Sequence, residues 1–148
     1  MTEVERGPGY LVKRVQQSLR RRCDSALKPT GLSMAQYSVL RALAAHPEAS
    51  AAELARLCFV TRQSLQDVLK TLRAEGHVEP SSAPVRGRAR SLQLTPRGAR
   101  LLAGGDSAVN QVESMMLQGM SVATRNRLAE LLMQCAENLE AADAATVE

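Results

Sequence analysis

Between residues 61 and 70, long polar side chains recur at helical spacing. They are Arg62, Gln63, Gln66 and Lys70, with Thr61 and Ser64 at the start of the segment. On a helix of 3.6 residues per turn, the four long side chains fall on or beside one side. Arginine, glutamine and lysine are the residues that hydrogen-bond base edges in a DNA major groove. The segment therefore predicts a DNA-reading helix, and an ordinary solvated helix side is the alternative.

Three arginines follow in a short segment with the pattern of a hairpin. They are Arg86, Arg88 and Arg90, inside a predicted loop over 80–89. Val78 begins one predicted strand, and the alternation of polar and apolar residues over 91–94 predicts the returning strand. An arginine at such a tip can enter the narrow, strongly negative minor groove of an A·T tract. A solvated loop is the alternative interpretation.

Helix-start signals define the elements that must position these side chains. Ser33 with Gln36, and Ser50 with Glu53, are capping boxes that open two helices, and Thr61 is the N-cap of the predicted reading helix. Pro47 closes the first of these helices and Gly76 the last. Three apolar residues are expected to face inward from the helix that begins after Ser50: Leu54, Leu57 and Cys58. The reading helix is expected to bury Leu65, Val68, Leu69 and Leu72. A helix, a turn, a second helix and a hairpin form a winged helix-turn-helix over residues 33–100.

Long helices are expected on both sides of this unit. One runs over 10–27, with Leu11, Val15, Leu19 and Cys23 as one apolar stripe. Another begins at Thr95-Pro96 and reaches about residue 118, with Gly104-Gly105 as a point of loosening. Ser121 caps the last helix, whose apolar stripe comprises Leu128, Leu131, Leu132, Cys135 and Leu139. Two terminal helices with apolar stripes predict pairing with a second copy, and packing on their own subunit is the alternative.

Length and composition limit the class of protein. The 148 residues form one predicted domain that is mainly α with a small β-wing. Residues 1–30 and 101–148 are the expected dimerisation region, flanking the DNA-binding core. The net charge is +4 overall, but it is +5 over residues 50–100 and −5 over 101–148. Because the positive charge is concentrated on the predicted reading segment, it favours a polyanionic partner there.

The sequence lacks the residue patterns that several other classes of function would require. The three cysteines, Cys23, Cys58 and Cys135, have neither zinc-site nor disulfide-framework spacing, so no metal or cofactor is expected. No apolar run is long enough to span a membrane, and the N-terminus lacks a signal peptide, so a cytoplasmic protein is expected. No catalytic motif is present, and no enzymatic activity is expected. One Phe, two Tyr and no Trp offer almost no stacking platform for single-stranded nucleic acid.

Three stretches in this order resemble the MarR family of bacterial transcription regulators. They are GLSMAQYSVLRAL, AELARLCFVTRQSLQDVLKTLRAEGHV and RSLQLTPRG, and the correspondence runs over about residues 10–139. The resemblance implies a homodimer that binds a pseudo-palindromic operator on double-stranded DNA and usually represses nearby genes. It also implies release from DNA by a small aromatic or phenolic effector. Tyr10, Arg14 and Tyr37 are candidate effector-binding residues, with the alternative that the tyrosines belong to the edge of the core.

The sequence departs from the family pattern at two functional positions. Arg86 occupies the place where relatives have a wing aspartate, and Asp67 lies where the reading helix often has a basic residue. These departures keep open a second function, a dimeric winged-helix adaptor for proteins that does not bind DNA. A thiol-based redox sensor is a further alternative. The sensor cysteine of such relatives corresponds to a position near Tyr10, where this chain has none. Cys23, on the apolar stripe, is interpreted as a packing group.

Overall fold

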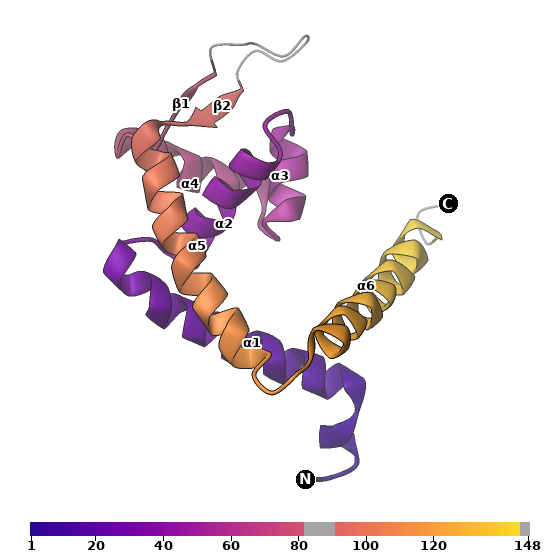
Figure 1. Cartoon of the computed structure of the whole chain (residues 1–148). Coiled ribbons are helices and arrows are strands. Elements are labelled where there is room, and N and C mark those ends of the chain that lie inside the picture. Colours follow the sequence, from indigo (N-terminus) through magenta and orange to yellow (C-terminus); the bar gives the residue numbers. More distant parts are fainter. Residues whose placement is uncertain (82–90, 146–148) are drawn as a thin grey trace. The chain divides into compact units, whose positions relative to one another are not determined.

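The computed structural model describes residues 1–81 and 91–145 and divides into two compact units, Met1–Glu113 and Ser114–Glu148. The elements run in the order η1 (Val4–Arg6), α1 (Pro8–Leu27), η2 (Lys28–Thr30), α2 (Met34–Ala45), α3 (Ala51–Leu57), α4 (Arg62–Ala74), β1 (Val78–Pro80), β2 (Leu92–Leu94), α5 (Pro96–Met116) and α6 (Val122–Ala145). This mainly helical order with a small two-stranded sheet is the predicted winged helix-turn-helix (Figure 1).

Local hydrogen bonds explain where the helices begin. Ser33 and Ser50 each accept a hydrogen bond from the backbone three residues ahead, and Gln36 and Glu53 bond back to complete two capping boxes. At the start of α5, Thr95 Oγ1 accepts from the backbone N–H of Gly98 at 3.0 Å and donates to the carbonyl of Gly76 at 2.6 Å. Each cap satisfies N–H groups that the first helical turn leaves unpaired.

The core of the first unit lies where α2, α3 and α4 meet beneath the sheet. Its fully buried side chains include Leu27 of α1, Leu40 of α2, and Leu65 and Leu72 of α4. Strands β1 and β2 pair antiparallel, with Val78 opposite Leu94 and Pro80 opposite Leu92. Val78 is buried, so the sheet is attached to this core.

Burial along two helices differs from the sequence prediction. The stripe of α1 is not continuous: Cys23 and Leu27 are buried, whereas Leu11 and Val15 are exposed. Leu57, expected inside, is 45% exposed because the short α3 packs through Leu54 and Ala55. In α1 and in α3 the apolar residues have helical spacing, but only some of them pack against another element.

The glycine pair in α5 does not loosen the helix. The helix is continuous over Pro96–Met116, and Gly105 is buried. A Cβ added at Gly105 would stand 2.7 Å from Cδ2 of Tyr37. This glycine therefore allows the Tyr37 ring to pack closely on α5, which is a packing role.

The second unit consists mainly of α6. None of its described residues is buried, and Leu131, Leu132 and Leu139 of the predicted apolar stripe are exposed. No helix among the described residues is long and apolar enough to cross a membrane.

Candidate nucleic-acid interface

Helix α4 has one buried side and one polar side. Leu65, Leu69 and Leu72 are buried against the core. The residues predicted to contact DNA are all on the exposed remainder of the segment: Thr61, Arg62, Gln63, Ser64, Gln66 and Lys70. Of the four residues expected inside, Val68 is only half-buried. All six side chains are therefore exposed on the part of this segment that does not pack against the core, and their contact with DNA stays a prediction.

Two of these residues also build the start of α4. Thr61 Oγ1 accepts a hydrogen bond from the backbone N–H of Ser64 at 3.1 Å, and the two hydroxyls are 3.0 Å apart. This cap leaves Arg62 and Gln63 in the first turn, at the positive end of the helix dipole. A phosphate or a base edge approaching this end meets both the guanidinium and the amide.

An internal hydrogen bond on the exposed side was missed from the sequence. Gln63 Nε2 donates to Asp67 Oδ1 at 3.2 Å, and Thr71 Oγ1 donates to the backbone carbonyl of Asp67 at 3.2 Å. The spacing of four residues between Gln63 and Asp67 was the available signal, because such residues are neighbours on a helix. Asp67 therefore holds the amide of a predicted reading residue while DNA is absent.

The described part of the wing is the antiparallel pair of β1 and β2, and its last described hydrogen bond joins two serines. Ser81 N–H donates to the Ser91 carbonyl at 2.7 Å, and Gln93 Nε2 donates to Glu79 Oε1 at 3.2 Å. The three predicted wing arginines, Arg86, Arg88 and Arg90, lie outside the described residues. Their role stays a prediction.

The three predicted effector-binding residues have different surroundings. Tyr10 is exposed on α1, and Arg14 Nη1 lies 3.9 Å from Met1 Sδ. Tyr37 is buried, and its hydroxyl donates to Asp106 Oδ1 at 2.7 Å. None of the hydrogen bonds or ion pairs found in the described chain joins Tyr37 to Tyr10 or Arg14.

Asp106 is the centre of a small polar cluster that links α2 to α5. Arg41 Nη1 donates to the same Asp106 oxygen at 2.6 Å. Burial, followed by the hydrogen bond to Asp106, raises the pKa of Tyr37 to about 12, so the phenol stays neutral. Sequence reasoning missed Asp106, although it is a lone acid in the otherwise small and apolar stretch LLAGGDSAV.

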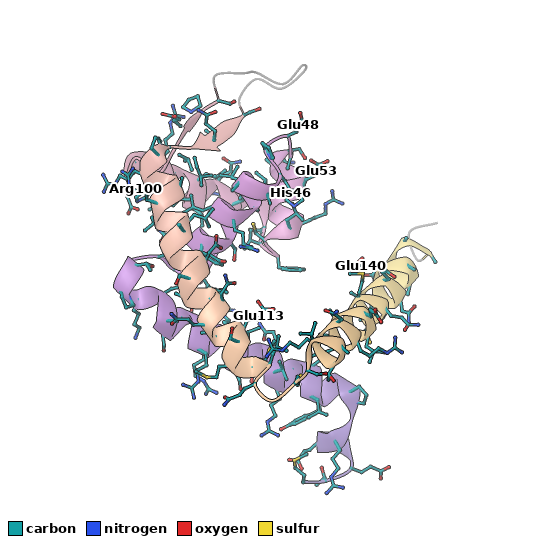
Figure 2. The ribbon with its side chains drawn as sticks, viewed as in Figure 1. His46, Glu48, Glu53, Arg100, Glu113 and Glu140 are labelled. Atoms are coloured by element: carbon teal, nitrogen blue, oxygen red, sulfur yellow. The ribbon has the colours of Figure 1, made fainter. Side chains whose placement is uncertain are left out.

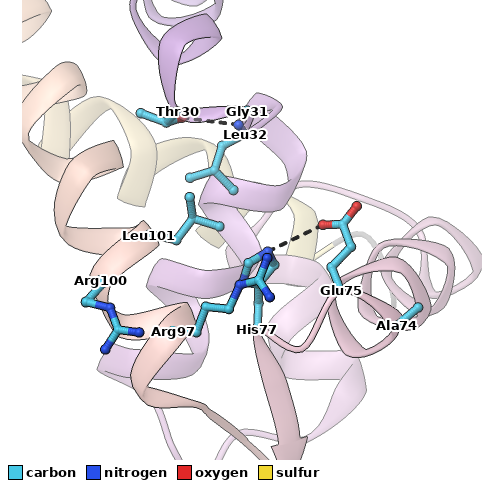
Figure 3. Close-up of a pocket in the computed structure, with 9 residues that line it drawn as sticks. All are labelled: Thr30, Gly31, Leu32, Ala74, Glu75, His77, Arg97, Arg100 and Leu101. Carbon is cyan, nitrogen blue, oxygen red and sulfur yellow. Dashed lines mark hydrogen bonds and ion pairs between the residues drawn. The ribbon is translucent and has the colours of Figure 1, made fainter.

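A cavity of about 740 Å³ lies within the first unit, between the α1–α2 connection, the end of α4 and the start of α5. Figure 3 shows its lining residues, with Leu32 and Leu101 as apolar groups and Arg97 and Arg100 as cations. His77 is 7% exposed, and its Nε2 lies 3.5 Å from Glu75 Oε2. Its Nδ1 is buried and has no hydrogen-bond partner among the residues that the structure describes. The cavity size is within the range of small-molecule sites.

The charged groups elsewhere are spread over the surface. Figure 2 places Glu48 and Glu53 near the start of α3, Arg100 near the start of α5 and Glu140 on α6. The described residues contain no group of three His, Cys, Asp or Glu side chains arranged to hold a metal ion.

The thiols differ in burial. Burial and, after it, the charges of Asp24 and Glu113 raise the pKa of Cys23. Burial also raises the pKa of Cys58, whose Sγ lies 3.5 Å from the Ser38 carbonyl. Since the thiolate is the reactive form, both shifts oppose redox chemistry at these two residues.

Helices α2 to α4 followed by a strand pair define a winged helix-turn-helix protein, in which α4 is the second helix of the motif and has an exposed polar side. A model described as the MarR family matches residues 30–89. The HTH-type transcriptional repressor Rv2887 of Mycobacterium tuberculosis is 32% identical over 124 residues, which cover 84% of this chain and 89% of the relative. The chain belongs to the MarR family of winged-helix transcription regulators.

Solved structures agree with this assignment. The complex of Rv2887 with DNA has a TM-score of 0.70 at 31% identity and covers 87% of this chain and 97% of its own. The complex of Rv2887 with salicylic acid has a TM-score of 0.72 at 31% identity, with coverages of 87% and 96%. The transcriptional repressor CouR, bound to a 23-mer DNA duplex, has a TM-score of 0.78 at 27% identity and covers 92% of this chain and 96% of its own.

Proposed function

We propose that this protein is a sequence-specific repressor that binds double-stranded DNA as a homodimer at a pseudo-palindromic operator. The observation that carries the proposal is the exposed polar side of α4, opposite the buried leucines that fix it in the helix-turn-helix. The DNA complexes of Rv2887 and CouR support it by likeness. Gln66 and Arg62 are the proposed base-reading residues, and the wing arginines are proposed to contact the flanking backbone or groove.

The proposed dimer rests on apolar surface that a single chain leaves uncovered. Val12 and Val15 of α1 and Leu132 and Leu139 of α6 are all exposed, the last at 71%. A long helix with no buried residue gains little stability from its own propensity, so a partner is needed to cover its apolar side. A second copy supplies that cover and a second reading helix for the other half-site.

Fluorescence anisotropy with a labelled duplex from upstream of the protein's own gene tests this function, with a scrambled duplex as control. We expect preference for the upstream duplex and a steep fall in affinity with salt. Gln66→Ala should reduce that preference by about 1–3 kcal/mol, whereas Arg88→Ala should weaken both duplexes and lower the salt slope by about one. If neither duplex binds at low salt, the adaptor function replaces this proposal. Sedimentation equilibrium tests the dimer, and a monomer at micromolar concentration refutes it.

The effector is proposed to be a small aromatic carboxylate or phenol, in line with the salicylic acid complex of Rv2887. The cavity beside His77 suits this class because its lining combines two arginines with the apolar side chains of Leu32 and Leu101. Tyr37 suits it less, since its hydroxyl already donates to Asp106.

Calorimetric titration with salicylate compares the two places. If the cavity is the site, Arg97→Gln with Arg100→Gln should abolish binding, while Arg14→Gln should leave it unchanged. The reverse pattern would support the site of Tyr10, Arg14 and Tyr37. No heat with the wild type would refute the proposed ligand class.

A further inference from the structure

Phe59 lies in the turn between α3 and α4 and combines two unfavourable properties. Its side chain is 95% exposed, and its backbone φ is 55°, in the left-handed region. The other described residues with positive φ are glycines: Gly31, Gly76 and Gly119. Bulky residues rarely adopt this conformation because their Cβ crowds the backbone.

The turn itself does not need a phenyl ring. Val60 N–H donates to the Ala55 carbonyl at 3.0 Å, and Phe59 N–H donates to the Arg56 carbonyl at 3.1 Å. This pair of bonds is a Schellman motif, in which the left-handed position usually holds glycine.

Helix α4 ends in the same motif and provides an internal comparison. His77 N–H donates to the Leu72 carbonyl at 2.9 Å, and Gly76 N–H donates to the Arg73 carbonyl at 3.1 Å. The left-handed residue there is Gly76, with a φ of 79°. The two turns share one hydrogen-bond pattern, so the phenyl ring at the first is an addition that the fold does not require.

The ring gives the isolated chain no burial energy and occupies a strained backbone position. Strained residues of this kind are concentrated at functional sites, where a partner uses them. Phe59 precedes the N-cap Thr61 by two residues, so it lies at the end of α4 that approaches the groove. The exposed cations Arg56 and Arg62 lie three residues before and after it.

We propose that Phe59 is a DNA-contacting residue whose ring packs on a deoxyribose at the edge of the groove that α4 enters. The assignment rests on the proposed DNA-binding function. A deoxyribose offers apolar surface between two phosphates, and this turn offers an exposed apolar ring with an exposed arginine three residues away on each side in the sequence. The match in both charge and polarity selects the DNA backbone as the partner.

The test compares the full-length wild type with Phe59→Asn, Phe59→Tyr and Arg62→Gln. Asparagine tolerates the left-handed region, and tyrosine keeps the ring. Duplexes enriched by the wild type from a random library serve as the labelled probe, together with the unselected library. Anisotropy is measured over a salt series, and thermal unfolding is measured at one protomer concentration.

Phe59→Asn should bind both probes roughly tenfold more weakly with an unchanged salt slope, because it removes apolar contact and no charge. It should also unfold about 2–4 °C higher, since the backbone strain is relieved. Phe59→Tyr should bind like the wild type. Arg62→Gln removes a positive charge, so it should weaken binding and make the salt dependence less steep, unlike Phe59→Asn.

Separate outcomes identify separate errors. Wild-type affinity in Phe59→Asn overturns this inference and leaves the DNA-binding function intact. A lower unfolding temperature in Phe59→Asn shows that the ring is structural and also overturns it. Unchanged DNA affinity with altered sedimentation would assign the ring to contact between copies. If the wild type enriches no duplex, the proposed function fails together with the inference.

Discussion

Three glycines of α5 should respond in three different ways to the same substitution by alanine. A Cβ at Gly98 would lie 2.0 Å from the backbone oxygen of His77, whereas at Gly104 the nearest atom is Thr30 Cγ2 at 3.9 Å. At Gly105 it would lie 2.7 Å from the Tyr37 ring. All three variants add the same methyl group to the same helix. Differences in their free energies of unfolding therefore arise from the atoms that surround each glycine.

The expected magnitudes follow from two opposing terms. Replacing glycine by alanine inside a helix stabilises by up to about 1 kcal/mol. Overpacking costs about 1–3 kcal/mol. The upper end applies at Gly98 because the His77 carbonyl is fixed by a 3.0 Å hydrogen bond from Thr95 N–H. We therefore expect Gly98→Ala to lose about 2 kcal/mol and Gly105→Ala about 1, as the Tyr37 ring can shift. Gly104→Ala should gain about 0.5–1 kcal/mol.

Urea unfolding followed by circular dichroism measures these differences. All variants must be compared at one protomer concentration, because association would add to the apparent stability. Equal slopes with denaturant would show that midpoint shifts report stability alone. If Gly98→Ala is as stable as Gly104→Ala, the close approach of α5 to the start of β1 is refuted.

Three further predictions concern charge and reactivity. Asp67→Asn should strengthen binding to unselected duplexes and steepen its salt dependence, because a carboxylate facing phosphates is removed; unchanged anisotropy titrations would contradict this. The raised pKa of Tyr37, about 12 against an ordinary 10, favours the folded state up to about pH 10, and this stabilisation is lost between pH 10 and 12. Unfolding free energies measured from pH 8 upward should decline less for Tyr37→Phe, and parallel curves would show that burial and the Asp106 bond do not raise the pKa of Tyr37. Cys23, buried and with a raised pKa, should resist iodoacetamide in the folded protein; mass spectrometry showing modification as fast as in urea would reopen the thiol-sensor alternative.

The elements were predictable wherever their signals are local. The caps at Ser33, Ser50 and Thr61 lie within three residues of the N–H groups they satisfy, and the structure forms all three. Alternation over 91–94 was likewise enough to predict β2.

Burial and surface contacts were less predictable because they depend on distant segments. Helical spacing placed Leu57 and Val15 on apolar stripes, but it does not say where the neighbouring element ends. The role of Gly105 depends on Tyr37, which is far away in the sequence. The glycine pair itself predicted only a point of loosening in the helix that begins at Pro96. The turn rule would have placed glycine at position 59, so the left-handed Phe59 is visible only in three dimensions.

We propose that the polar side of α4 balances attraction to DNA against selectivity. In this proposal Arg62 and Lys70 attract any phosphate, and the carboxylate of Asp67, which lies between them in the sequence, opposes part of that nonspecific attraction. In the free protein Asp67 accepts a hydrogen bond from Gln63, so its carboxylate has a partner. Binding at a chosen sequence can replace that bond, since a cytosine amino group donates to a carboxylate and an adenine edge satisfies the glutamine amide. An incorrect sequence offers neither the cytosine amino group nor the adenine edge, so the carboxylate is left close to the DNA phosphates without a hydrogen-bond donor. The proposed role of Asp67 is thus to lower overall affinity while increasing the difference between correct and incorrect duplexes.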